Sequence, residues 1–137
     1  MDVERLAPTV GLVGAVCLVG AVALPGIVIA PGGGPTASYY ASGPIGLSIV
    51  GLLAMLSVIV FLSGRQNRTD PATAAGLALV LSLAMLSIAT IWAFSINPTV
   101  LFSFEQEYSW LEYHRWSVLA AALLTFVGAA GYARSVL

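Results

Sequence analysis

The sequence predicts an all-α fold, an integral membrane antiparallel four-helix bundle that forms one domain of 137 residues. Hydrophobic residues make up 59% of the chain and charged residues only 8%, whereas a soluble domain carries about 25% charged residues. The charges fall outside four apolar runs, and each run is long enough, at about 1.5 Å per residue, to cross about 30 Å of hydrocarbon. The predicted spans cover residues 6–30, 44–63, 71–95 and 116–133.

The first span contains two prolines with different expected effects. Pro8 suits the first turn of a helix, where its missing N–H costs nothing. Pro25 is expected to kink the helix or end it near Leu24, because proline removes one backbone hydrogen bond. A cleaved signal peptide is not expected, because the chain does not start with a basic segment and the apolar run is too long.

The second and third spans form a hairpin joined by the Arg-bearing turn 64–70, and neither span contains a charged residue. Pro44 and Pro71 each fit a first helical turn. Asp70 is the predicted N-cap of the third span. The single cysteine, Cys17, lies within an apolar run and is expected to pack between helices.

Arginine placement predicts the orientation, because cytoplasmic loops are enriched in basic residues. Four arginines fall on one side of the predicted spans and Arg115 alone falls on the other. Both termini and turn 64–70 are therefore expected in the cytoplasm of a multi-pass cell-membrane protein, with loops 31–43 and 96–115 outside. The sequon at Asn67 then lies inside, so no N-glycan is expected.

Small residues at helical spacing are expected to let the spans approach closely, since lipid gives helices no hydrophobic reason to associate. Met55 and Met85 are expected in the core. None of the spans carries Asp, Glu, Lys, Arg or His at mid-depth, which disfavours an ion-coupled transporter built from these helices alone. The small residues concerned are Gly11 and Ala15, Ala78 and Ser82, Ala121, Thr125 and Ala129, and Gly128 and Gly131.

The segment 96–116 holds most of the chemistry-bearing side chains. One interpretation anchors its aromatic rings at the membrane surface, and another makes it a protein-contact surface. A metal site on Glu112, His114 and a nearby glutamate is a third, although residues two apart on one helix point in different directions. We predict no catalytic residue, cofactor or metal ligand, but a candidate interaction surface of Glu105, Glu107, Tyr108, Trp110, Glu112, Tyr113, His114, Arg115 and Trp116.

Three stretches, residues 39–44, 64–76 and 110–116, resemble small four-span membrane proteins of haloarchaea. The resemblance extends over most of the chain. It implies a four-helix membrane fold and a salt-adapted cell, and it assigns no catalytic residues. The presence of arginine without lysine fits such an origin.

Three functions remain open from the sequence. The first is a non-enzymatic accessory or scaffold subunit that contacts other membrane proteins. The second is a homo-oligomeric pore or carrier, in which Ser and Thr faces line a path between copies. The third is an enzyme or metal-binding sensor at the outer loop. Nucleic acid is not an expected partner, because the net charge of −1 leaves no basic surface.

Overall fold

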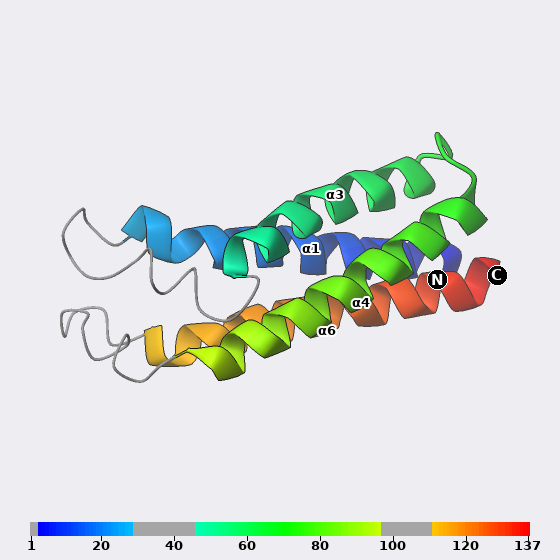
Figure 1. The fold of residues 1–137 in the computed structure, drawn as a ribbon. Coiled ribbons are helices and arrows are strands. Elements are labelled where there is room, and N and C mark those ends of the chain that lie inside the picture. The colour runs from blue at the N-terminus through cyan, green and yellow to red at the C-terminus, as the bar shows by residue number, and fades with distance from the viewer. Residues whose placement is uncertain (1–2, 29–45, 97–110) are drawn as a thin grey trace.

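Four antiparallel helices form the fold in the computed structural model, which describes residues 3–28, 46–96 and 111–137. Each helix packs mainly on two others, in the order α1, α3, α4, α6 and back to α1. Both termini and the α3–α4 turn lie at one end of the bundle (Figure 1). All four helices are long and apolar enough to cross a membrane. The helices are α1 (Val3–Val28), α3 (Leu47–Arg65), α4 (Pro71–Ser95) and α6 (Leu111–Val136).

The start of α4 confirms the sequence prediction. The helix begins at Pro71 and ends at Ser95. The Oδ2 atom of Asp70 accepts a hydrogen bond of 3.2 Å from the backbone N–H of Thr73. This bond pairs one of the N–H groups that the first turn of a helix leaves without an intrahelical partner.

The ends of the other three helices differ from the prediction. Helix α3 begins at Leu47 rather than Pro44, after Gly46 with a φ of 89°. Glycine adopts that φ angle readily, and the angle is not helical. Helix α6 begins at Leu111, five residues before the predicted start, because its first turns are polar but helical and hydropathy indicates only the apolar part of a helix. Helix α1 continues through Pro25 to Val28.

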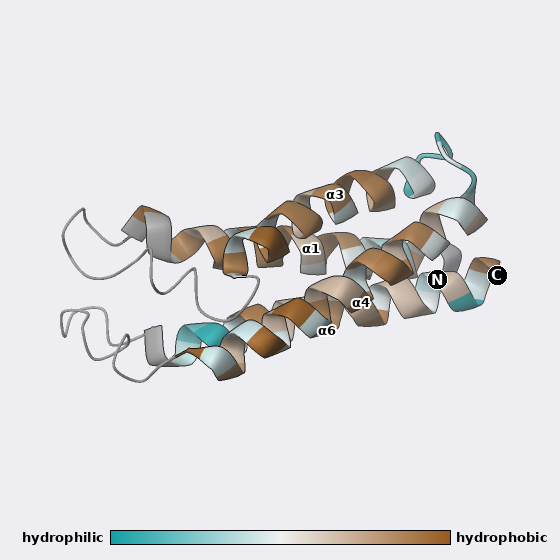
Figure 2. Ribbon diagram, in the orientation of Figure 1, coloured by the Kyte–Doolittle hydropathy of each residue, from teal (hydrophilic) through white to brown (hydrophobic). Residues whose placement is uncertain are grey.

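The core consists of two apolar clusters, one toward each end of the bundle. Trp92 and Leu18 lie in the first cluster, and Phe61 and Tyr132 lie in the second. Hydrophobic colouring covers most of the helices, whereas hydrophilic colouring gathers at the α3–α4 turn and the start of α6 (Figure 2). Three fully buried hydroxyl residues, each near the middle of its helix, lie along the core: Ser57, Ser82 and Thr125.

Small residues bring α1 and α6 into backbone contact, as predicted. A Cβ atom added to Gly128 would overlap backbone atoms of Gly11, and one added to Gly14 would lie 2.7 Å from the Thr125 nitrogen. Met85 is buried in the core, as expected. The prediction for Met55 is wrong, because its side chain is 49% exposed on the outside of α3. The prediction that Cys17 packs between helices is also wrong, because its side chain is exposed on α1.

Candidate functional site

A cluster of polar and aromatic side chains lies where α1 and α4 finish and α3 and α6 begin, and we call this the His114 end. The first turns of α6 supply Tyr113, His114, Arg115 and Trp116. Because consecutive helical residues point about 100° apart, these four side chains reach different neighbours.

His114 replaces a backbone hydrogen bond that Pro25 removes from α1. In a regular α-helix the carbonyl of Ala21 would accept a hydrogen from the N–H of residue 25. Residue 25 is proline and has no N–H. The Nε2 atom of His114 lies 2.5 Å from that carbonyl oxygen, and the side chain is only 4% exposed. Since a carbonyl only accepts, Nε2 must carry the hydrogen.

Arg115 makes a similar contact with the end of α4. Its Nη1 atom donates a hydrogen bond of 3.2 Å to the carbonyl of Ala93, one of the last four carbonyls of the helix, which lack helical partners. A cation there also opposes the negative end of the helix dipole. The guanidinium carbon lies 5.4 Å from the centre of the Trp116 ring, within the range of a cation–π contact.

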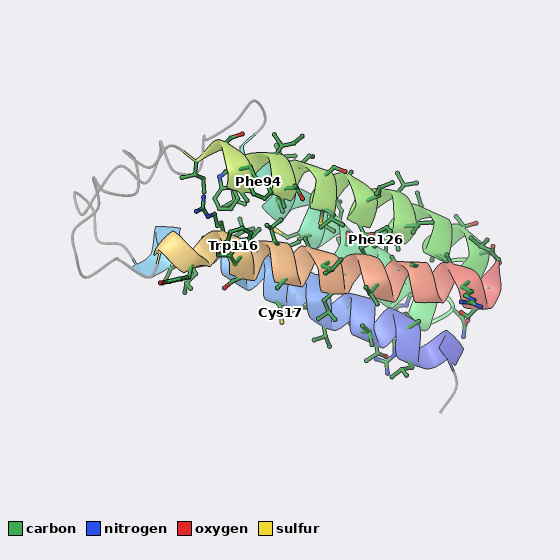
Figure 3. The ribbon with its side chains drawn as sticks, turned by 90° about the horizontal axis from the view of Figure 1, so that it is seen from below. Cys17, Phe94, Trp116 and Phe126 are labelled. Atoms are coloured by element: carbon green, nitrogen blue, oxygen red, sulfur yellow. The ribbon has the colours of Figure 1, made fainter. Side chains whose placement is uncertain are left out.

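Aromatic rings surround these two polar contacts. Trp92 meets His114 edge-on, with ring centres 6.1 Å apart. Phe94 meets Trp116 in a similar T-shaped pair at 6.0 Å, and the two lie close together at this end of the bundle (Figure 3). Three rings remain open to the surroundings, because Phe94 is 70% exposed, Tyr113 69% and Trp116 48%.

The predicted interaction surface is thus only partly described. Tyr113 and Trp116 are exposed, Arg115 is half-buried, and His114 is buried, which removes it from the contact surface. The side chain of Glu112 and the remaining predicted residues lie outside the described part of the chain, namely Glu105, Glu107, Tyr108 and Trp110. Within the described ranges, no three His, Cys, Asp or Glu side chains are grouped as metal ligands.

His114 and Arg115 bond to the main-chain carbonyls of Ala21 and Ala93, and neither partner was predicted from the sequence. Pro25 was a usable signal, because a proline inside a helix always leaves the carbonyl four residues earlier without its donor. Phe94 was also not predicted as part of the surface.

The buried hydroxyl groups bond to their own helices. Ser57 donates to the Leu53 carbonyl and Thr125 to the Ala121 carbonyl. Ser82 bonds in the same way to Leu79. These three side chains are buried within one copy of the chain, so they are not available to line a path between copies.

The fold and this cluster define a small four-helix protein whose helices have the length and hydropathy of membrane spans. Comparison with curated proteins and with solved structures found no match. The chain belongs to a family of unknown function, DUF7548, whose model matches residues 1–137.

Proposed function

We propose that this protein is a non-enzymatic accessory or scaffold subunit of the cell membrane, which contacts another membrane protein at its His114 end. The observation that carries the proposal is the exposure of Tyr113, Phe94 and Trp116 beside two polar groups that are already bonded to the backbone. The rings form the contact surface, and the polar groups hold the helices that carry them.

The division of roles within the cluster supports a contact surface over a reaction centre. His114 and Arg115 each bond a main-chain carbonyl of a different helix, and these bonds fix α6 against α1 and α4. Aromatic side chains supply much of the binding energy at protein interfaces, and they are also common where a helix leaves the membrane. Three exposed rings on a fixed backbone lose little entropy on binding.

We further propose that the termini and the α3–α4 turn face the cytoplasm. In a Cys17→Ala background, Gln66→Cys at the turn should react with a membrane-impermeant maleimide only after cells are opened. Ser95→Cys, at the other end of α4, is the matched control and should react in intact cells. Both positions are exposed. The reverse pattern would contradict this orientation, as would an N-glycan on Asn67.

Partner contact can be tested with a photo-reactive phenylalanine analogue placed at Tyr113 in native membranes. We expect illumination to yield a discrete adduct with a second membrane protein, identified by mass spectrometry after gentle extraction and sizing. The control position is Val80, which is 68% exposed but lies away from the His114 end, and it should yield no such adduct.

Two outcomes would count against the subunit proposal. One is a homogeneous species that contains this chain alone, with no adduct from position 113. The other is ion or solute flux through liposomes that contain only this protein, which would support a pore or carrier instead. Recovery of the partner should also fall several-fold in Trp116→Ala, because that change removes an exposed ring and leaves the His114 bond in place.

A further inference from the structure

An open apolar groove runs between α1 and α3 in the half of the bundle nearer the His114 end. Its volume is about 510 Å³. Small residues, Ala23 and Gly51, form part of its lining, and the exposed side chains of Ile27, Leu52 and Met55 also border it. The complete lining is Val19, Val22, Ala23, Ile27, Ser48, Gly51, Leu52 and Met55.

The groove is polar at one end only. Ser48 is its single polar side chain, and it is the second residue of α3. Its hydroxyl is exposed and makes no hydrogen bond to the part of the chain that the structure describes. No charged side chain lines the groove. Beyond Ser48, the lining consists of hydrocarbon side chains, the Met55 thioether and the Gly51 backbone. The Ser48 hydroxyl lies at the end of the groove nearest the end of the bundle.

The length of the groove fits half a membrane. From Ser48 to Met55 the helix rises about 10 Å, and from Val19 to Ile27 it rises about 12 Å. One leaflet of a hydrocarbon core about 30 Å thick is about 15 Å deep. A partner helix that crossed the membrane would need a matching surface along the whole span.

We propose that this groove binds one hydrocarbon chain of a lipid in the leaflet at the His114 end. The lipid chain lies along α1 and α3, and the Ser48 hydroxyl donates a hydrogen bond to an oxygen of the lipid's glycerol or headgroup region. The inference depends on membrane insertion, and it does not depend on a protein partner at the aromatic surface.

Photo-crosslinking tests the site with the purified protein in phosphatidylglycerol vesicles that contain a lipid with a diazirine on its hydrocarbon chain. We expect adducts to concentrate on peptides that carry residues 19–27 and 48–55. Ala23→Trp places a large ring in the groove and should lower adduct yield there at least five-fold. Ala120→Trp adds the same ring to an exposed position of α6 and should leave the yield unchanged.

Leu52→Trp is a second groove variant in case Ala23→Trp fails to fold, and each variant is first compared with the parent by sizing in detergent. Adducts spread evenly over the exposed faces of all four helices would overturn the proposal. So would an adduct yield that neither groove variant lowers. A photo-reactive side chain at Ala23 that captures another protein in native membranes, rather than lipid, would assign the groove to a partner helix instead.

Discussion

Gly128→Ala is expected to push α1 away from α6 and to lower the free energy of unfolding by about 1–3 kcal/mol or more. The added Cβ would overlap the backbone nitrogen and Cα of Gly11. Backbone atoms cannot rotate aside as a flexible side chain can, so the two helices must separate along their contact. Gly128→Val should have a still larger effect. Unfolding by SDS titration in mixed micelles, followed by circular dichroism, measures the change.

Two other glycines provide matched controls for that substitution. A Cβ added to Gly20 or to Gly76 would meet nothing within 4 Å. Gly20→Ala and Gly76→Ala are therefore expected to be neutral or slightly stabilising, because alanine favours the helix more than glycine does. If Gly128→Ala behaved like these two controls, the close approach of α1 and α6 would be contradicted.

His114→Ala is expected to lower the free energy of unfolding by about 1–3 kcal/mol, the usual cost of leaving a buried polar group without a partner. The group left without this donor is the Ala21 carbonyl, which Pro25 has already deprived of its helical donor. His114→Gln keeps an N–H donor on a side chain of similar length and should recover part of the loss. The same SDS titration applies.

A double-mutant cycle with Pro25→Ala can separate the loss of this hydrogen bond from the loss of packing around His114. Alanine at position 25 restores a backbone N–H that can pair with the Ala21 carbonyl within α1. His114→Ala should then cost less in the Pro25→Ala background than in the parent, with a coupling energy of about 0.5–3 kcal/mol. Equal costs in both backgrounds would show that His114 contributes only packing.

Features that depend on neighbouring residues were predictable from the sequence, whereas features that depend on contacts between two helices were not. The start of α4 followed from Asp70 and Pro71, because capping depends on neighbouring residues. The start of α6 did not, because hydropathy marks where a helix becomes apolar and not where its hydrogen bonds begin. A buried small-residue pattern was predictable from spacing, whereas the particular contact of Gly128 with Gly11 required the packed bundle.

The candidate site shows the same division. The sequence predicted a cluster of aromatic and polar residues near position 114, and the described members of that cluster lie at one end of the bundle. Pro25 indicated which carbonyl of α1 would lack a donor, but nothing local to either residue says that a side chain 93 positions after Ala21 supplies it. Met55 was wrongly predicted in the core, because its hydrophobicity fits an outer face in contact with lipid as well as it fits a core.

The bond between His114 and Ala21 has a consequence for the order in which the chain is made. Helix α1 is synthesised first and α6 last, so the Ala21 carbonyl has no His114 donor until almost the whole chain has left the ribosome. The hydroxyls of Ser57, Ser82 and Thr125 are paired as soon as their own helices form. Until α6 packs on α1, the Ala21 carbonyl therefore has neither a helical donor nor the His114 donor. The bond to α1 is thus made only by docking of α6, whereas the serine and threonine bonds need no second helix.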